Sequence, residues 1–395
     1  MEQLDADTSA DMICPSEDDV SVYIEGRASA TTVERILRHL DRCSTCRQIL
    51  AHAMRQREHG PKVANRAGVL HTFFVGETIN GRYRISRFMA RGGMGEVYEA
   101  WDTLLQERIA LKTIVCTSLD DAKLLARIRS EVQLARRVTH PNVCRILEFG
   151  LHHRNHQDRA DAIPYFTMEL LGGETLARFR ARRGIVAESE ALPIIVQVLE
   201  GLSAIHAAGI VHRDLKPENV FVIPAETGRL RAVVTDFGLA RSLDTLDSGL
   251  QSSINTLVGT PAYMAPEQAV GSAASVSWDI YALGVMLFEV LTGQLPFEGP
   301  TAVALALARV KRVAPAVTTL NPQVGHELET IVARCLQRDP KHRYPDVEAL
   351  RIAVLSIVKS ARPTKARHGT LFWWALATLG GLLAGFVDPI QIFAK

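Results

Sequence analysis

The stretch "IVHRDLKPENVFV", residues 210–222, constrains the fold of this chain more than any other part of the sequence. Two short apolar runs enclose five polar or charged side chains, those of His212, Arg213, Asp214, Lys216 and Asn219. A plain surface loop does not require so many different functional groups within eight positions. We therefore expect a reactive loop that is held between strand-like segments.

The residue types in this loop suit the transfer of a phosphoryl group. Asp214 can accept a proton from an attacking hydroxyl, and Lys216 can neutralise charge on the transferred group. Asn219 offers an amide oxygen to a hard cation. Asp236, in "VVTDFGLAR", ends an apolar run, where its carboxylate can hold Mg²⁺ against nucleotide phosphates.

A glycine-rich stretch, "ARGGMGEVY", lies between two strand-like runs nearer the N-terminus. Glycines let backbone N–H groups approach a polyphosphate, although a plain tight turn explains this stretch equally well by itself. Lys112, in "IALKTI", follows about 20 residues later and can reach the same phosphates. Glu131, in the helical stretch "RIRSEVQLARRV", is a natural partner for Lys112, and a solvent-facing helix acid is the alternative.

The order "ARGGMGEVY", "IALK", "HRDLKPEN", "DFG", "GTPAYMAPE" resembles the signature set of the protein kinases. The resemblance covers residues 83–358 and implies an α+β fold with a small β-rich N-lobe and a larger helical C-lobe. It also implies ATP and Mg²⁺ (or Mn²⁺) as cofactors and proteins as substrates. The net charge of +2 gives no general case for a nucleic-acid partner.

The resemblance also assigns the site residues. Catalysis falls to Asp214, Lys216, Asn219 and Asp236, of which Asn219 and Asp236 hold Mg²⁺. Nucleotide binding falls to Ala90, Arg91, Gly92, Gly93, Met94, Gly95, Val97, Lys112, Glu131, Met168, Glu169 and Leu171. Ala90 departs from the family, which has its first loop glycine there, and we expect a modest loss of ATP affinity at most.

"HRDLKPEN" and "GTPAY" are the serine/threonine form of the family motifs, and "VGTPAYMAPEQ" looks most like the bacterial receptor-type kinases. The same resemblance has Asp279 brace the catalytic loop and Arg343 pair with Glu267. Phosphorylation beside Arg213 is expected on at least one of Ser252, Ser253 and Thr256. A pseudokinase scaffold stays open as an alternative, favoured by Ala90 alone.

Near the N-terminus, His39, Cys43 and Cys46 have the spacing H-x3-C-x2-C, and Cys14 lies upstream as a fourth ligand. Cys14 is the best candidate for the fourth ligand, and His52 and His59 are weaker candidates. Such a set suits structural Zn²⁺, although small core cysteines and a redox pair remain alternatives. "HLDRCSTCRQIL" resembles the zinc-binding domain of anti-sigma factors. We expect a helical zinc module over residues 12–55 and a linker over 56–80. The resemblance implies a sigma factor or other regulatory protein as partner, so a partner-binding regulator is a further alternative.

Residues 371–387, "LFWWALATLGGLLAGFV", carry no charge and follow a basic linker over residues 359–370. They predict a single transmembrane helix, although a buried C-terminal core helix is the alternative. The basic flank predicts single-pass insertion in the inner membrane, with the N-terminal module and kinase domain in the cytoplasm. Gly381 and Gly385 form a small-xxx-small pair that favours a homodimer.

Overall fold

The computed structural model describes residues 14–24, 27–43, 45–47, 50, 71–92, 95–114, 122–154, 162–225, 228–237, 261–299 and 301–360. Two units divide the chain, Met1–Leu355 and Ser356–Lys395, and only residues 356–360 of the second are described. The expected transmembrane helix therefore lies outside the described residues. Among the described helices only α6 (Glu188–Ala207) is long and apolar enough to cross a bilayer, and half of the stretch that qualifies is buried inside the protein.

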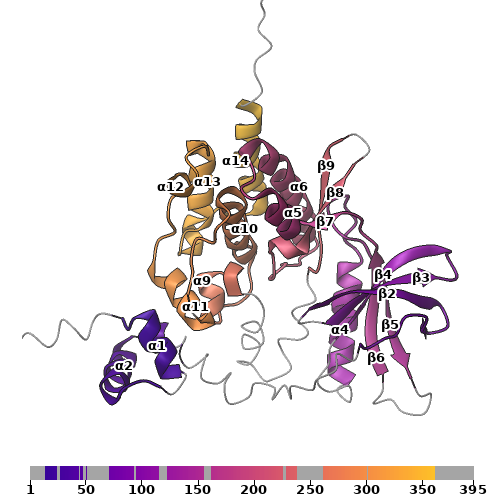
Figure 1. Ribbon diagram of the computed structural model, residues 1–395, viewed down its shortest axis with the longest axis horizontal. Helices are drawn as coiled ribbons and strands as arrows, with labels where there is room; N and C mark the ends of the chain where they lie inside the picture. The colour runs from indigo at the N-terminus through magenta and orange to yellow at the C-terminus, as the bar shows by residue number, and fades with distance from the viewer. Residues whose placement is uncertain are drawn as a thin grey trace, which may run out of the picture. The chain divides into compact units, whose positions relative to one another are not determined.

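The small lobe is built on a six-stranded antiparallel sheet with the order β1-β2-β3-β4-β6-β5. Its strands are β1 (Thr78–Ile79), β2 (Tyr83–Gly92), β3 (Gly95–Asp102), β4 (Glu107–Thr113), β5 (Ile146–His153) and β6 (Ala162–Glu169). Helix α4 (Ala122–Ala135) lies against β5, as Figure 1 shows. Its apolar residues Leu124, Ile128 and Val132 recur at helical spacing and are buried.

Residues 71–80 correct the linker expected over 56–80, because they belong to the small lobe. Phe73 is 1% exposed and packs in the sheet core with Tyr98, Ile85 and Leu111. Ile79 in β1 joins the same core and pairs with Tyr83 of β2. We call residues His71–Glu77 the strap, since they cross this core before the first strand.

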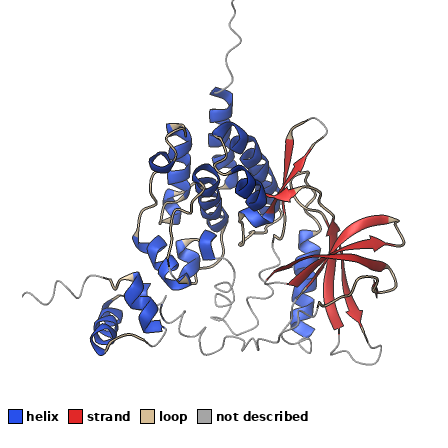
Figure 2. Cartoon of the chain, in the orientation of Figure 1, coloured by secondary structure: helices blue, strands red, loops and turns tan. Residues whose placement is uncertain are grey.

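The large lobe is mostly helical, in contrast to the small lobe, as Figure 2 shows. Its longer helices are α5 (Leu176–Arg183), α6, α10 (Val276–Thr292), α11 (Ala302–Lys311), α13 (His326–Cys335) and α14 (Val347–Ser360). Shorter helical turns are η5 (Pro261–Tyr263), α9 (Pro266–Ala269), α12 (Val317–Leu320) and η6 (Pro340–His342). Helix α10 is buried from Asp279 to Thr292, as its continuous apolar sequence predicts. Gly284 lets α13 approach closely, because a Cβ there would lie 2.6 Å from the Cβ of Cys335.

A second sheet, β7-β8-β9, carries the reactive loop. Its strands are β7 (Glu174–Thr175), β8 (Val220–Pro224) and β9 (Leu230–Val234). The loop runs from α6 to β8 and ends in the short helix η3 (Pro217–Asn219). The backbone N–H of Cys144, just before β5, donates to the carbonyl of Val234, so the small-lobe chain is tied to β9.

The N-terminal segment contains α1 (Glu17–Ile24) and α2 (Ala30–Arg42). Ser29 caps α2, because its side chain accepts the N–H of Thr32. Val20 and Ile36 form a buried cluster with Cys46, Leu50 and, from α11, Leu307. Apolar packing therefore joins these two helices to the large lobe.

Candidate active site

The reactive loop brings three of its predicted residues together. Lys216 Nζ lies 2.8 Å from Asp214 Oδ2. The side-chain amide of Asn219 donates to the Asp214 carbonyl at 2.7 Å and to Asp214 Oδ2 at 3.1 Å. Because the amide N–H groups of Asn219 are spent on Asp214, its amide oxygen is left for another partner. The carboxylate of Asp214 is one-third exposed, so a substrate hydroxyl can reach it.

Asp279, on the first turn of α10, holds the backbone of this loop. Its buried carboxylate accepts the N–H groups of His212 at 2.8 Å and Arg213 at 2.9 Å, and it contacts His206 Nε2 at 2.7 Å. Arg213 has φ 70°, a left-handed conformation that non-glycine residues seldom adopt. The expected bracing role of Asp279 is therefore present as a set of hydrogen bonds, and sequence reasoning missed His206 as a member of it.

The loop is also tied to the segment that carries Asp236. His212 Nε2 lies 2.9 Å from the carbonyl oxygen of Thr235, and the Thr235 N–H donates to the Asn219 carbonyl at 2.8 Å. Asp236 itself has φ 59°. These contacts fix the place of Asp236 relative to Asp214 through the backbone.

Lys112 pairs with Asp236 in this structure. Its Nζ lies 2.6 Å from Asp236 Oδ1, and the lysine is 6% exposed. Burial opposes ionisation of Asp236, but the ammonium of Lys112 outweighs it and lowers the pKa of the carboxyl. Glu131 is the expected partner of Lys112, yet no ion pair between them exists among the described residues. The sequence offers both Glu131 and Asp236 as acids near Lys112, and it does not decide which one the lysine binds.

The glycine-rich hairpin, residues 90–97, joins β2 to β3. Ala90 faces Val97 and Arg91 faces Glu96 in the strand register, and Val97 in turn faces Lys112 on β4. Ala90 is not among the described residues with positive φ, so its methyl group is accommodated without backbone strain. Gly95 has φ 146°, and a Cβ there would lie 1.9 Å from the Thr113 carbonyl oxygen. Gly93 and Met94 lie outside the described residues.

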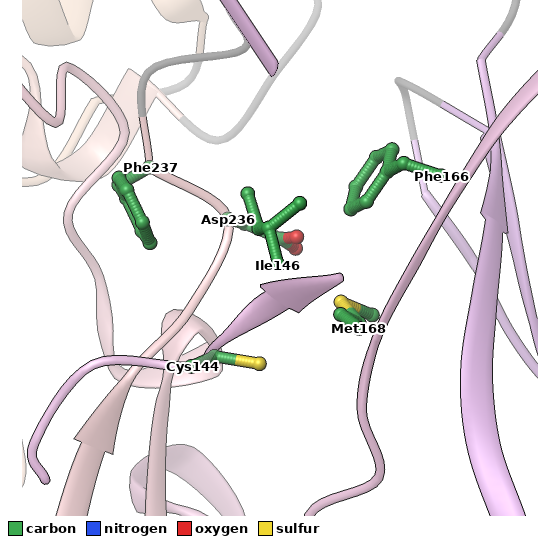
Figure 3. A pocket seen from close by; sticks show the side chains of 6 residues that line it. All are labelled: Cys144, Ile146, Phe166, Met168, Asp236 and Phe237. Atoms are coloured by element: carbon green, nitrogen blue, oxygen red, sulfur yellow. The ribbon is translucent and has the colours of Figure 1, made fainter. Parts of the chain in front are cut away.

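A cavity lies between the two sheets beside Asp236 (Figure 3). It is lined by Cys144, Ile146, Phe166, Met168, Asp236 and Phe237. Met168 enters it from the end of β6, next to Glu169, whose N–H donates to the Arg145 carbonyl at 2.9 Å. Burial raises the pKa of the Cys144 thiol, so this cysteine stays protonated. Sequence reasoning missed Cys144, because a cysteine in an apolar run gives no functional signal. Leu171 lies two residues after Glu169 and is half-buried.

Arg343, before α14, binds Glu267 of α9 through two parallel hydrogen bonds of 2.7 and 2.8 Å. The guanidinium is fully buried, and it also donates to the carbonyl oxygens of Ser277, Gln337 and Arg338. The expected pair between Arg343 and Glu267 is therefore present, with additional backbone acceptors that the motif does not reveal.

A model of the protein kinase domain matches residues 83–353. The chain belongs to the protein kinase family. The match contains every catalytic-loop contact described above and leaves out the strap, β1 and the N-terminal segment. Residues 238–260 lie outside the described residues, and Ser252, Ser253 and Thr256 are among them.

Curated relatives of the kinase are named as serine/threonine-protein kinases. It is 38% identical over 277 residues to probable PknB of Lactococcus lactis, and the aligned residues make up 70% of this chain and 42% of that protein. It is 35% identical over 293 residues to PrkC of Bacillus subtilis, and the aligned residues make up 74% of this chain and 43% of that protein. It is 34% identical over 291 residues to PknA of Mycobacterium tuberculosis, and the aligned residues make up 74% of this chain and 64% of that protein. The matched part thus spans less than two thirds of the length of these relatives.

Solved structures share the fold of the kinase. The kinase domain of Mycobacterium tuberculosis PknI aligns with a TM-score of 0.54 at 22% identity, over 72% of this chain and 99% of that one. The structure of Rad53 residues 1–466, solved with AMP-PNP, aligns with a TM-score of 0.56 at 25% identity, over 69% of this chain and 65% of that one. The two-lobed architecture with a β-rich N-lobe and a helical C-lobe is therefore that of the kinase family.

Four side chains outside the kinase match also lie together. The ligand atoms of Cys14, His39, Cys43 and Cys46 are all within 4.8 Å of one another. The His39 ring is 4% exposed, and neither of its nitrogens has a hydrogen-bond partner among the described residues. A buried imidazole without partners is costly unless a ligand binds it, so this set fits a tetrahedral metal ion.

Proposed function

We propose that this chain is an ATP-dependent serine/threonine protein kinase. One observation carries the proposal, namely the contact of Asp214 with both Lys216 and Asn219 in a loop braced by Asp279. Asp214 would take the proton of a substrate hydroxyl while that oxygen bonds to the γ-phosphorus and the bond to the β–γ bridging oxygen breaks. Lys216 would offset the negative charge on the transferred group. Bound ATP would supply that group, and a divalent cation would neutralise its charge.

The choice of serine and threonine rests on the sequence of two segments. Lys216 follows Asp214 by two residues, and "GTPAY" stands before α9. Relatives with 34–38% identity are named as serine/threonine-protein kinases, which supports the same choice. Mg²⁺ or Mn²⁺ would be held by Asn219, through its spare amide oxygen, and by Asp236.

The test uses the purified full chain with labelled ATP and Mg²⁺. Asp214→Asn keeps the size of the side chain but cannot accept the proton, so autophosphorylation should fall by about 1,000-fold or more. Asp346→Asn serves as the matched control, since this exposed aspartate caps α14 and asparagine caps equally well. Full activity in Asp214→Asn would refute the mechanism. A wild-type chain that binds ATP but transfers nothing would instead support the pseudokinase alternative.

We further propose that phosphorylation at Ser252, Ser253 or Thr256 orders the segment after Asp236. Arg213 lies beside Asp214, where a phosphate would add a strong anionic partner. Mass spectrometry of highly active protein should find phosphate on at least one of these residues. A highly active preparation without phosphate there would refute this switch.

We infer that Cys14, His39, Cys43 and Cys46 bind one structural Zn²⁺ in an anti-sigma-like module. The mutual distances of their ligand atoms and the unpartnered, buried His39 support this set over a redox pair. Metal analysis should give about one zinc per chain. Cys43→Ser should lose it, while Cys335→Ser, a buried cysteine in α13, should keep it. A folded, metal-free chain with two oxidisable thiols would favour the redox alternative. A pull-down with the full chain, with and without Cys43→Ser, would test a sigma factor or other regulatory partner.

We also propose that residues 371–387 anchor the protein in the inner membrane, with the preceding domains in the cytoplasm. The support is the uncharged sequence, the flanking Trp373 and Trp374, and the basic residues Arg362, Lys365 and Arg367. Full-length protein should stay with membranes in carbonate, and a chain that ends at Lys365 should be released. Full-length protein in the soluble fraction would refute the anchor and the membrane homodimer argued from Gly381 and Gly385.

A further inference from the structure

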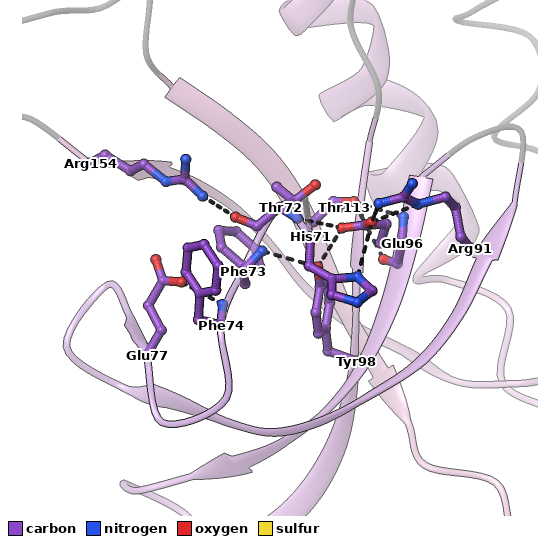
Figure 4. A network of polar contacts seen from close by, with 10 residues as sticks. All are labelled: His71, Thr72, Phe73, Phe74, Glu77, Arg91, Glu96, Tyr98, Thr113 and Arg154. Atoms are coloured by element: carbon purple, nitrogen blue, oxygen red, sulfur yellow. Dashed lines mark hydrogen bonds and ion pairs between the residues drawn. The ribbon is translucent and has the colours of Figure 1, made fainter. Parts of the chain in front are cut away.

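The strap, residues His71–Glu77, lies outside the region that the kinase family model matches. It is nevertheless fixed to the small lobe at several points (Figure 4). The Phe73 ring packs against Tyr98 with 5.6 Å between ring centroids, and the backbone N–H of Phe73 donates to Tyr98 Oη at 3.0 Å. The His71 ring packs on the Phe88 ring of β2 with 4.3 Å between ring centroids and a tilt of 40° between the ring planes. Both apolar packing and backbone hydrogen bonds thus hold this segment.

One carboxylate joins the strap to both arms of the glycine-rich hairpin. Glu96, at the start of β3, is 4% exposed and accepts the Thr72 N–H at 2.7 Å. It also accepts the Arg91 Nε–H, from the end of β2, at 2.7 Å. Tyr98 donates its hydroxyl to the same carboxylate. Glu96 is therefore a junction between the strap, the first arm and the second arm of the hairpin, as Figure 4 shows.

The charge of Glu96 is held in place by these partners. Burial opposes its ionisation, but the hydrogen bonds from Tyr98, Thr72 and Arg91 outweigh burial and lower the pKa of Glu96 to about 2. The carboxylate is thus ionised at neutral pH, and hydrogen bonds to an ionised acceptor are stronger than neutral ones.

This junction lies next to the residues expected to meet the ATP phosphates. Glu96 follows Gly95 directly, and its own N–H donates to Thr113 Oγ1 at 2.9 Å. Thr113 in turn follows Lys112. The N–H groups of the hairpin must point at the phosphates for tight binding, so any loosening of its two arms should weaken nucleotide binding.

We propose that the strap positions the phosphate-binding hairpin through Glu96, and that ATP affinity therefore depends on a segment outside the matched kinase domain. The inference rests on the proposed function, since ATP is taken as the ligand. Glu96 and Thr72 are positioning residues, because Glu96 faces the strap and Arg91. The strap follows the expected linker to the cysteine and histidine cluster, so a partner that displaces the strap would lower ATP affinity without touching the catalytic loop.

The test measures Mg·ATP binding to the full chain by calorimetry, which needs no phosphoryl transfer. Glu96→Gln removes the charge and keeps the volume. Thr72→Pro removes the N–H that Glu96 accepts, and Thr72→Ser keeps it. Glu99→Gln is the matched control on the same strand, because Glu99 is 7% exposed and pairs with Arg87 and Arg108, away from the strap.

Glu96→Gln and Thr72→Pro should each weaken ATP binding about tenfold, as expected for a lost hydrogen bond to a charged group. The double variant should also be about tenfold weaker, because both changes cut the same connection. Thr72→Ser and Glu99→Gln should stay within about twofold of wild type. The KM for ATP should follow the binding constant while kcat stays within about twofold, which a general loss of folded protein would not produce.

Two results would overturn the proposal. The first is an equal effect of Glu96→Gln and Glu99→Gln on ATP binding at equal melting temperatures. The second is a double variant that binds ATP about 100-fold more weakly than wild type, which would mean that the strap and Glu96 act independently. If Thr72→Pro does not fold, the comparison of Glu96→Gln with Glu99→Gln decides alone. A wild-type chain that binds ATP but phosphorylates nothing would refute the proposed function and leave this inference standing.

Discussion

At the scale of single residues, the site contains two residues in an unusual backbone conformation, and one buried carboxylate, that of Asp279, holds one of them. Arg213, at φ 70°, and Asp236, at φ 59°, flank the reacting groups, and each left-handed residue costs on the order of 1 kcal/mol. Asp279 offsets this cost at Arg213 by accepting two consecutive N–H groups. The strain is thus placed at Arg213, which precedes Asp214, and at Asp236, the carboxylate that we propose holds Mg²⁺.

Asp279→Asn should disturb the catalytic loop without removing any reacting group. The amide has one acceptor oxygen, and its NH₂ group would face an N–H donor, so one backbone hydrogen bond is lost and a repulsive contact replaces it. We expect kcat to fall about 100-fold, since small displacements of reacting groups have effects of that size. Nucleotide binding should remain near wild type. A variant with wild-type kcat would contradict the bracing role.

Glu96 should make a pH-dependent contribution to stability. Its folded-state pKa of about 2 lies below the usual 4.5, so the contribution is complete above pH 4.5 and is lost as the pH falls toward 2. The difference in unfolding free energy between wild type and Glu96→Gln should therefore be constant above that pH and shrink below it. Urea titrations between pH 7 and pH 2.5 would measure it. A difference that grows on acidification would contradict the assignment.

At the scale of elements, sequence patterns predict those parts whose signal is local. The strand-like runs on both sides of the glycine-rich stretch form β2 and β3, and the helical stretch that contains Glu131 forms α4. The strap was missed, because Phe73 and Phe74 stand in a short stretch without a helical or alternating period, and the burial of Phe73 depends on Tyr98, 25 residues away. The partner of Lys112 was also missed, since two acids compete for one lysine and only packing decides between them.

Arg343 should be the most sensitive link between elements of the large lobe. Arg343→Met removes a buried cation and leaves the Glu267 carboxylate without its partner, which costs about 3–5 kcal/mol. Arg343→Lys keeps the charge but loses the paired hydrogen bonds, so it should lie between Arg343→Met and wild type. Thermal unfolding of the three proteins measures the order. Wild-type melting in Arg343→Met would show that the pair does not contribute to stability.

At the scale of the whole molecule, the N-terminal helices share their core with the large lobe. Leu307 of α11 completes the cluster of Val20 and Ile36, and Lys311 Nζ donates to the Pro15 carbonyl at 3.1 Å. Ala306 of the same helix packs on Met264 and on Ala269 of α9. One helix therefore contacts both the cysteine and histidine cluster and the turn that contains Met264 of the "GTPAYMAPE" motif.

Chelation of the full chain should unfold α1 and α2 while the kinase domain keeps its own melting transition. Metal binding and folding are coupled in small metal modules, whereas the kinase core needs no zinc. Hydrogen exchange should show loss of protection over residues 14–50 and little change in α10. Cys335→Ser should behave as wild type in the same experiment. Retention of protection over residues 14–50 after chelation would contradict a structural metal.

The strap also sets where this protein can be divided for recombinant expression. A fragment that begins at residue 83, where the family match starts, would lack Phe73 and the edge strand β1. Tyr98 and Ile85 would then face water, and exposed apolar surface of this kind promotes aggregation. A fragment that begins at residue 71 keeps these partners. Solubility and yield should therefore differ sharply between two start points that both retain the complete recognised domain.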